Sequence, residues 1–209
     1  MLEGIRNIAV DGLIGVGKTG LAVELAKRLN YTLILDIASE NPFLSSFYNS
    51  PRGHAFQTQI YFLLSRVREL RKLLSPALFG GVVTDITMAR DRIYARVNLN
   101  DEEFALYEQI ANELQRGLNP PEAVILLYAS PEYLYYHLRK RGIKKVEEEY
   151  LEKLAEAFSE YYYRNTTSGL LIVDVESVDF VKNPEEVGRI IELLPARGVR
   201  YYSVKPSIF

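Results

Sequence analysis

The sequence of 209 residues contains no cysteine and only two histidines, His54 and His137. Disulfide bonds, thiolate metal sites and a cysteine nucleophile are therefore excluded, and two histidines alone cannot form a histidine-rich metal site. No apolar run approaches the roughly 20 residues that a membrane-spanning helix requires. The segment Met1–Gly4 also lacks the basic and then apolar pattern of a signal peptide. We therefore expect a cytoplasmic protein without a membrane partner.

The sequence also lacks a strong excess of charge of either sign, because 27 acidic residues nearly balance 25 lysines and arginines. The net charge of −2 argues against broad binding of nucleic acids. Basic residues do cluster between Arg139 and Lys145, which favours a small anionic ligand over a duplex. The length is sufficient for one α/β domain with a sizeable core, so we expect residues 1–209 to form a single domain.

One stretch, Gly12 to Thr19, matches the phosphate-binding pattern G-x-x-x-x-G-K-[ST]. Glycines allow the backbone to curl so that successive N–H groups point at one anion, the lysine reaches the outer phosphates, and the threonine hydroxyl ligates Mg²⁺. A buried strand is predicted before it and a helix, Leu21–Leu29, after it, so phosphates would lie at a helix N-terminus. The predicted nucleotide-binding residues are Gly12, Leu13, Ile14, Gly15, Val16, Gly17, Lys18 and Thr19.

Five apolar runs rich in β-branched residues are separated by helical patterns, which predicts a parallel sheet with helices on both faces. These runs are Ile5–Asp11, Tyr31–Ile37, Gly81–Ile86, Ala123–Ala129 and Leu170–Val175. Ligands of such sheets bind beyond the carboxyl ends of the strands. The first three runs end near Asp11, Asp36 and Asp85, and we expect these carboxylates to face the rim of the phosphate loop.

The segments between the runs predict helices. Asn41 and Pro42 are typical of the N-cap and the first residue of a short helix. In the next helix, at about 53–74, Gln59 and Arg66 lie two turns apart on one face, and the spacing leaves open whether that face is solvated or binds a ligand. Further helices are predicted at about 101–116, 131–141, 145–164 and 184–194. No function is predicted for residues 195–209.

Several segments outside the phosphate loop resemble those of deoxynucleoside kinases, of the bacterial deoxyadenosine and deoxyguanosine kinase type. The most specific are Glu40–Leu44 with Phe47 and Tyr48, Phe56–Gln59 with Ser65 and Arg66, Asp91–Arg96, and Leu106–Gln109. The resemblance implies a three-layer P-loop nucleoside-kinase fold of class α/β, with a five-stranded parallel sheet flanked by helices. It also implies that a phosphoryl group passes from ATP, with Mg²⁺, to the 5′-hydroxyl of a deoxynucleoside, with purines weakly favoured.

The resemblance assigns the chemical steps to particular residues. Asp36 would orient the 5′-hydroxyl and take its proton, while Thr19 and Asp85 would hold Mg²⁺. Phosphoryl transfer relies mainly on positioning and charge stabilisation, so the cations around the moving group are important. The cations implied, in the phosphate loop and in a lid at about 137–147, are Lys18, Arg139 and Arg141.

The resemblance also assigns the contacts with the substrates. Gln59 matches a glutamine whose amide can bond a base edge as donor and acceptor together, and Tyr48 matches a tyrosine that bonds the sugar 3′-hydroxyl. Asp179 and Phe180 resemble the turn that flanks the donor adenine. Members of the family commonly form homodimers through their long helices, here about 53–74 and 101–116. The substrate-binding residues implied are Tyr48, Gln59, Arg66, Asp91 and Glu147.

Three departures from the family pattern are evident. Related kinases often carry Asp/Glu-Arg-Ser after the third strand, where this chain has Asp85–Thr87 with isoleucine in the middle. Arg90 and Arg92 are both candidates for the missing arginine, and spacing alone does not choose between them. The usual catalytic glutamate is replaced by Asp36, which is one methylene shorter, and His137 stands where an arginine is common.

Two other classes of P-loop protein are compatible with the phosphate loop alone. A nucleoside monophosphate kinase, such as a thymidylate kinase, usually has an arginine after the third strand to meet its anionic acceptor, and Ile86 argues against that class. A GTP-dependent switch protein reads guanine through Asn-Lys-x-Asp, which this sequence lacks. The preferred base depends on the shape of the substrate pocket, which the sequence does not determine.

Overall fold

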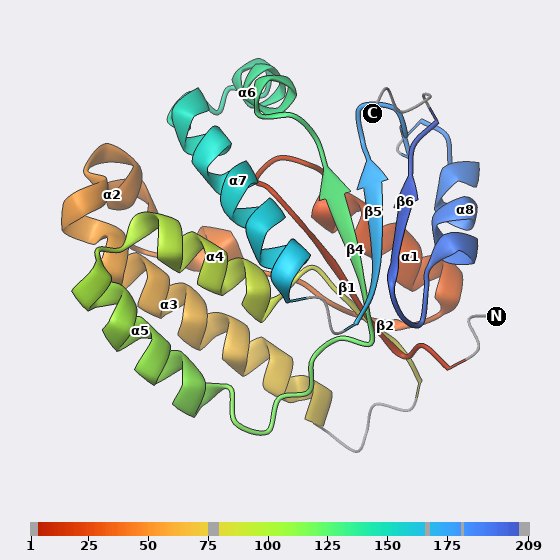
Figure 1. Ribbon diagram of the computed structural model, residues 1–209, viewed down its shortest axis with the longest axis horizontal. Helices are drawn as coiled ribbons and strands as arrows, with labels where there is room; N and C mark the ends of the chain where they lie inside the picture. The colour runs from red at the N-terminus through yellow and green to blue at the C-terminus, as the bar shows by residue number, and fades with distance from the viewer. Residues whose placement is uncertain (1–3, 75–79, 166–167, 181, 205–209) are drawn as a thin grey trace.

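A computed structural model describes residues 4–74, 80–165, 168–180 and 182–204 of the chain. At its centre is one six-stranded parallel sheet in the order β2-β3-β1-β4-β5-β6 (Figure 1). The strands are β1 (Asn7–Gly12), β2 (Thr32–Ile34), β3 (Val82–Thr84), β4 (Ala123–Tyr128), β5 (Gly169–Asp174) and β6 (Val199–Tyr202). The predicted parallel α/β sheet is confirmed, whereas the prediction of five strands is wrong by one.

The additional strand is β6, which lies in the segment for which no function is predicted. It pairs in parallel with β5, with Leu170 opposite Val199 and Val173 opposite Tyr202. Its sequence, Val-Arg-Tyr-Tyr, is short, and its first three residues are exposed. Strands β1, β3, β4 and β5 are recognisable as largely buried apolar runs, and this edge strand lacks that signal.

Helices cover both faces of the sheet (Figure 1). Helices α1 and α8 lie on one side, and α3, α4, α5 and α7 lie on the other. Two short 3₁₀ helices, η1 (Ala38–Glu40) and η2 (Lys72–Leu74), precede α2 and follow α3. The bounds of the α-helices are α1 (Lys18–Leu29), α2 (Leu44–Asn49), α3 (Pro51–Arg71), α4 (Met88–Asn98), α5 (Asp101–Leu114), α6 (Pro131–Lys140), α7 (Glu148–Arg164) and α8 (Glu185–Leu193). Within the described ranges, no helix combines the length and apolar character needed to cross a membrane.

The start of α2 differs from the sequence prediction. This helix begins at Leu44 and not at Pro42. The Oδ1 atom of Asn41 accepts a hydrogen bond from the N–H of Phe43 at 3.0 Å, and its Nδ2 donates to the carbonyl oxygen of Thr58 at 3.1 Å. Asn41 therefore forms a turn that is anchored to α3, and it does not cap a helix at the next residue.

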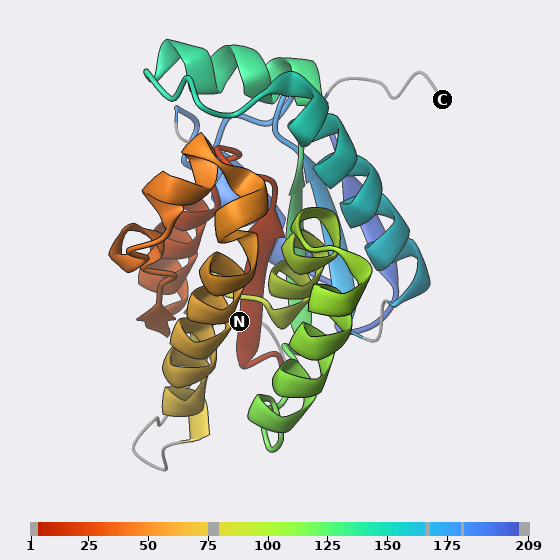
Figure 2. The ribbon, with the colours of Figure 1, turned by 90° about the vertical axis from the view of Figure 1, so that its left-hand side faces the viewer.

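The strand order places β1 at the centre of the molecule. It lies between β3 and β4, and all of its residues after Asn7 are buried. The chain leaves β1 toward β2 and leaves β4 toward β5, so the carboxyl ends of β1 and β4 flank the switch point at which such sheets bind ligands. Figure 2 shows α6 lying across this end of the molecule.

Candidate active site

The phosphate loop follows β1 and leads directly into α1, which begins at Lys18, three residues before the predicted start. Gly12 and Gly17 have φ angles of +137° and +102°, a region that residues with a Cβ rarely adopt. A Cβ on Gly12 would also lie 2.4 Å from the carbonyl oxygen of Leu127. The loop therefore requires glycine at these positions, and the free N–H groups at the start of α1 are available to an anion.

Lys18 bends back over the phosphate loop, where its Nζ donates to the carbonyl oxygen of Leu13 at 2.7 Å. Burial, and then the nearby guanidinium of Arg90, lowers the pKa of Lys18 to about 7. The carboxylates of Asp11 and Asp85 offset this only in part. A bound polyphosphate would bring anionic oxygens beside Nζ and raise the pKa again.

Thr19 and Asp85 join the phosphate loop to the end of β3. Thr19 Oγ1 donates to Asp85 Oδ2 at 2.5 Å, and Asp85 Oδ1 accepts from the N–H of Asp36 at 2.7 Å. Within the described residues, no group of three or more His, Cys, Asp or Glu side chains could hold a metal by itself. Mg²⁺ prefers oxygen ligands and usually takes one or two carboxylates besides waters and substrate phosphates, so this pair fits Mg²⁺ in company with a nucleotide.

The carboxylate of Asp36 is held by two arginines. Its Oδ2 accepts from Arg66 Nη2 at 2.9 Å and Nε at 3.1 Å, and from Arg90 Nη2 at 3.0 Å. Burial by itself would raise the pKa of Asp36, but the guanidinium groups of Arg66 and Arg90 outweigh it and lower that pKa below its ordinary value. Asp36 is therefore ionised and fixed in one orientation.

Two arginines could replace the one missing at position 86, and only Arg90 reaches the cluster formed by Asp36, Arg66 and Asp85, which we call the Asp36 cluster. It is 4% exposed, and its Nη2 donates to Asp36 and to the carbonyl oxygen of Asp85. Its Nη1 lies 3.6 Å from Asp11 Oδ1 and has no hydrogen-bond partner among the described residues. The side chain of Arg92 is 49% exposed and pairs with a glutamate of α5.

Asp11 lies beneath the phosphate loop, so the prediction that it faces the rim is wrong. The residue is fully buried. Its Oδ1 accepts from the N–H of Gly12 at 2.8 Å, and its Oδ2 accepts from Thr87 Oγ1 at 2.7 Å and from the hydroxyl of Tyr162. Because Thr87 caps α4 and Tyr162 lies on α7, one carboxylate ties the loop to two helices.

A cavity of about 250 Å³ opens beside the Asp36 cluster, between the phosphate loop and helices α2, α3 and α4. Gln59 and Arg66 line it and are only 2% and 7% exposed, which excludes the alternative that they form a solvated face. The predicted site residues that line the cavity are Ile14, Gly15, Lys18, Thr19, Asp36, Tyr48, Gln59, Arg66, Asp85 and Arg90. The remaining lining residues are Leu44, Phe47, Thr58, Phe62, Tyr94, Asn98 and Tyr150.

Asp91 does not line the cavity but lies behind Arg66. One of its carboxylate oxygens accepts from Arg66 Nη1 and the other from the hydroxyl of Tyr107. Burial raises the pKa of Asp91, although Arg66 acts in the opposite direction. The backbone carbonyl of Asp91 accepts from Gln59 Nε2 at 3.4 Å. Asp91 therefore holds both side chains that were predicted to meet the base.

The segment predicted to form a lid, at about 137–147, contacts the phosphate loop and α2. Arg141 Nη1 donates to the carbonyl oxygen of Gly15 at 3.3 Å, and Lys145 Nζ donates to Asn49 Oδ1 at 3.0 Å. Helix α7 begins at Glu148 and not at about Lys145. Residues 143–147 are not helical, and Glu147 has extended backbone with φ −87° and ψ 152°.

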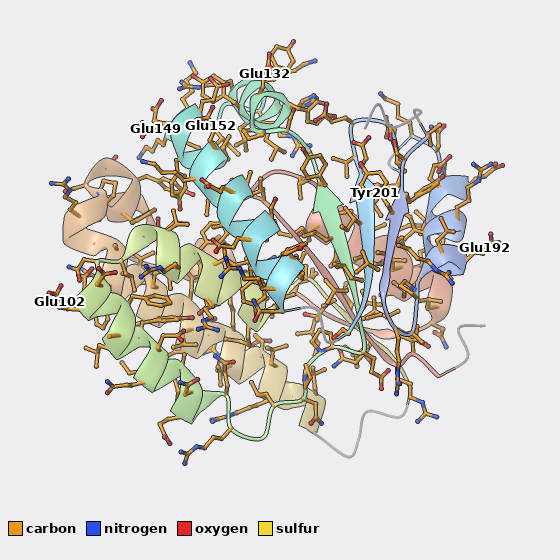
Figure 3. The ribbon with its side chains drawn as sticks, viewed as in Figure 1. Glu102, Glu132, Glu149, Glu152, Glu192 and Tyr201 are labelled. Carbon is orange, nitrogen blue, oxygen red and sulfur yellow. The ribbon has the colours of Figure 1, made fainter. Side chains whose placement is uncertain are left out.

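Arg139 and Glu147 form an ion pair within the lid, with 3.6 Å between Nη2 and Oε2. Arg139 lies over the ring of Tyr135, and its Nε is buried without a hydrogen-bond partner in the described part of the chain. Glu147 is exposed and does not line the cavity. Figure 3 shows that Glu132 and Glu149, also at this end, lie on the outer surface.

Asp179 and Phe180 lie at the end of the turn after β5. The ring of Phe180 is buried against the phosphate loop, so that a Cβ on Gly17 would lie 3.2 Å from its Cζ. Asp179 is on the surface and pairs with Lys182 at 3.1 Å. The structure thus brings this turn to the phosphate loop, and contact with an adenine stays a prediction.

Sequence reasoning assigned no role to several residues of the cavity wall. The ring of Phe62 packs against Arg66, with 4.6 Å from the guanidinium carbon to the ring centroid. Burial raises the pKa of Tyr94 and of Tyr150, so both hydroxyls are neutral donors. Tyr94 lies in one of the segments that mark the family, which was the available signal. Tyr150 lies in an acidic helix start, where nothing in the sequence distinguishes it.

A second, larger cavity of about 320 Å³ lies away from these groups, where the ends of α3, α5 and α7 meet the sheet. None of its described lining residues is charged. A polyphosphate is recognised by cations and backbone N–H groups. The cavity beside Lys18 combines cations with residues of the phosphate loop and is therefore the candidate active site, although it is smaller than this uncharged cavity.

Known proteins match this chain over most of its length. A family model described as deoxynucleoside kinase matches residues 8–197. Deoxyguanosine kinase of Bacillus subtilis (strain 168) is 32% identical over 192 residues, which cover 88% of this chain and 93% of that protein. Deoxyadenosine kinase of Dictyostelium discoideum is 32% identical over 199 residues, which cover 91% and 79%.

Solved structures share the fold. Deoxyadenosine kinase from M. mycoides with bound dATP aligns with a TM-score of 0.75 and 26% identity, over 90% of this chain and 97% of that one. The same kinase with bound dCTP aligns with a TM-score of 0.73 and 26% identity, over 88% and 96%. The family match spans nearly the whole chain and includes the phosphate loop, the Asp36 cluster and the cavity. The protein therefore belongs to the deoxynucleoside kinase family.

Proposed function

We propose that the protein transfers the γ-phosphoryl group of ATP to the 5′-hydroxyl of a deoxynucleoside, as a single domain with residues 137–147 as its lid. The observation that carries this proposal is the placement of Asp36. Its carboxylate is held by Arg66 and Arg90 in the same cavity that Lys18 and Thr19 line from the phosphate loop. A hydroxyl bound to Asp36 would face the end of the triphosphate.

Asp36 orients the hydroxyl and receives its proton. Both arginines bind Oδ2, and within the described part of the chain Oδ1 is the oxygen left to accept from a substrate hydroxyl. The lowered pKa makes Asp36 a weak base. That strength suits a loose transition state, in which catalysis depends on positioning more than on early proton removal.

Cations from two sides neutralise the charge on the transferred group. Lys18 and Arg90 approach it from the phosphate loop and α4, and Arg139 and Arg141 approach it from the lid. When bound by Thr19 and Asp85, Mg²⁺ would neutralise charge on the β- and γ-phosphate oxygens. The support for this arrangement is that Arg90 Nη1 and Arg139 Nε are buried polar atoms without hydrogen-bond partners among the described residues.

The deoxynucleoside occupies the cavity. Gln59 and Arg66 meet the base, Tyr48 meets the sugar, and Glu147 reaches the sugar when its pair with Arg139 opens. Asp91 acts by holding Arg66, and Asp179 and Phe180 flank the adenine of ATP. We propose purine deoxynucleosides as substrates, because the relatives with 32% identity are named deoxyguanosine and deoxyadenosine kinases.

The Asp36→Asn variant tests this function. Asparagine keeps the shape and an acceptor for both arginines but cannot take a proton, so kcat should fall roughly 10²–10⁴-fold while the deoxynucleoside still binds. Asp36→Glu restores a carboxylate and is expected to retain more activity. A folded Asp36→Asn enzyme with near-normal kcat would show that another residue is the base.

We also propose that the protein is a cytoplasmic homodimer that pairs through α3 and α5. Leu64 on α3 is 50% exposed and Leu106 on α5 is 47% exposed, and exposed apolar side chains on neighbouring helices are typical of an interface. Light scattering should give twice the chain mass of 23.9 kDa. The Leu64→Glu substitution should shift the protein toward a monomer. Cell fractionation tests whether the protein is cytoplasmic.

A further inference from the structure

Strand β6 lies just beyond residue 197, where the family match ends. It adds an edge to the sheet beside β5, and Figure 3 shows Tyr201 on this strand. The strand is also anchored to α8, because the hydroxyl of Tyr202 donates to Glu186. Residues 199–204 are therefore an integral part of the fold.

The end of β6 holds the turn Asp174–Phe180 that follows β5. Ser203 Oγ donates to Asp174 Oδ2 at 3.1 Å and lies 2.9 Å from Ser177 Oγ. The N–H of Val204 donates to Ser177 Oγ at 3.1 Å. Ser203 and Val204, which follow the strand, thus form hydrogen bonds with Asp174 and Ser177 of the turn.

The same turn reaches the phosphate loop and the start of the helix that leads to the lid. The ring of Phe180 packs against Gly17, which immediately precedes the phosphate-binding lysine. Glu176 Oε1 accepts from the N–H of Ser130, the N-cap of α6, at 2.6 Å. The turn therefore lies between the tail on one side and the nucleotide-binding elements on the other.

The strand order indicates which substrate this turn meets. The acceptor cavity is lined by Asp36 and Asp85, which follow β2 and β3, so it occupies that side of the phosphate loop. The carboxyl ends of β4 and β5 are on the opposite side. Ligands of parallel sheets lie beyond these ends, so the base and ribose of the phosphate donor have the β5 side available to them.

We propose that Ser203 is a positioning residue for the donor nucleotide, acting through the turn Asp174–Phe180. This inference rests on the proposed function, which fixes the direction in which donor and acceptor lie. The hydroxyl of Ser203 holds the turn at its outer edge, so that Phe180 stays against Gly17 and the turn keeps its shape beside the donor. Ser203 lies beyond residue 197, where the family match ends.

The test is Ser203→Ala, measured by steady-state kinetics with each substrate varied in turn. Loss of the Oγ contacts with Asp174 and Ser177 should raise KM for ATP roughly three- to tenfold. KM for the deoxynucleoside and kcat should stay within about twofold. Ser203→Thr, which keeps the hydroxyl, should restore KM for ATP, and Val199→Ala on the exposed start of the same strand should change none of these values.

An unchanged KM for ATP overturns the proposal, and so does a rise in both KM values together with a lower melting temperature, which would show a merely structural role. If the wild-type enzyme phosphorylates no deoxynucleoside, the proposed function fails separately. In that case, calorimetric titration of the wild-type protein and of Ser203→Ala with ATP and Mg²⁺ still tests the role of Ser203. Equal affinities would overturn it, and weaker binding by Ser203→Ala would support it.

Discussion

Arg90 and Arg92 lie on the same helix, yet only Arg90 enters the active site. Successive residues of an α-helix are rotated by about 100° about the helix axis. The side chains of two residues that are two positions apart therefore point to roughly opposite sides of the helix. Arg90 points at Asp36 and Asp11, while Arg92 points toward α5 and solvent. The packing of α4 on the sheet decides which of the two arginines faces the active site. Thr87, the N-cap of α4, donates a hydrogen bond to Asp11.

Removing the Arg90 guanidinium is expected to lower kcat roughly 10²–10³-fold, because a preorganised cation beside the reacting groups is lost. Arg92→Ala should leave kcat within about twofold, since exposed ion pairs contribute about 0–1 kcal/mol. Arg90→Ala and Arg92→Ala are compared by steady-state kinetics, with melting temperatures as a check on folding. Equal effects of the two substitutions would contradict the assignment of Arg90.

Lys18 has a lowered pKa of about 7, and this predicts proton uptake when ATP binds. At pH 8 the amine is largely neutral in the free enzyme, and bound phosphates raise its pKa so that it becomes charged. Titration calorimetry with MgATP in buffers of different ionisation enthalpy should therefore report uptake of up to about one proton at pH 8. The uptake should disappear near pH 6, where Lys18 is already protonated. Proton release at pH 8 would contradict the account.

At the scale of elements, the phosphate loop is shaped by the backbone freedom of its glycines. Gly12→Ala should lower the free energy of unfolding by about 2–5 kcal/mol, because a Cβ is strained at that φ and collides with a carbonyl of β4. Gly20→Ala is the matched control: Gly20 lies in α1, and apart from its chain neighbours and its own helix backbone no described atom lies within 4 Å of its Cβ position. That substitution should raise stability by about 0.5–1 kcal/mol in urea denaturation. Similar effects of both would refute this reading of the loop.

Three helices are joined to the active site through one buried network. Tyr107 of α5 binds Asp91 of α4, which binds Arg66 of α3, which binds Asp36. Tyr107→Phe leaves a buried carboxylate oxygen without its donor, at a cost of about 1–3 kcal/mol in stability.

We expect Tyr107→Phe to raise KM for the deoxynucleoside and to leave KM for ATP unchanged, because the network ends on the acceptor side. Tyr163→Phe, at an exposed position of α7, is the control and should change neither KM nor the melting temperature. A larger effect of Tyr107→Phe on KM for ATP than on KM for the nucleoside would show that the network does not serve the acceptor.

At the scale of the whole molecule, the central sheet was predictable because β1, β3, β4 and β5 are largely buried and appear as apolar runs. The phosphate loop was predictable because its fixed spacing has a physical cause. Strand β6 was not, since an exposed edge strand of four residues carries little apolar signal. The start of α2 was also missed, because Asn41 bonds to Thr58, a contact that only the packed structure creates.

The candidate active site was likewise predictable from the sequence only in part. Family segments located Gln59 and Arg66, and the end of the second apolar run located Asp36; the structure brings the three together in one cavity. The network through Tyr107 and the burial of Asp11 depend on contacts between distant elements, which no local pattern encodes.

The central claim is that this kinase phosphorylates deoxynucleosides and not their monophosphates. The direct measurement is ADP release from MgATP, coupled to a spectroscopic readout, with a panel of four deoxynucleosides and the four corresponding 5′-monophosphates. We predict turnover with deoxynucleosides, fastest with deoxyadenosine or deoxyguanosine, and a 5′-monophosphate as the product identified by mass spectrometry. Turnover with a monophosphate and with no deoxynucleoside would contradict the account.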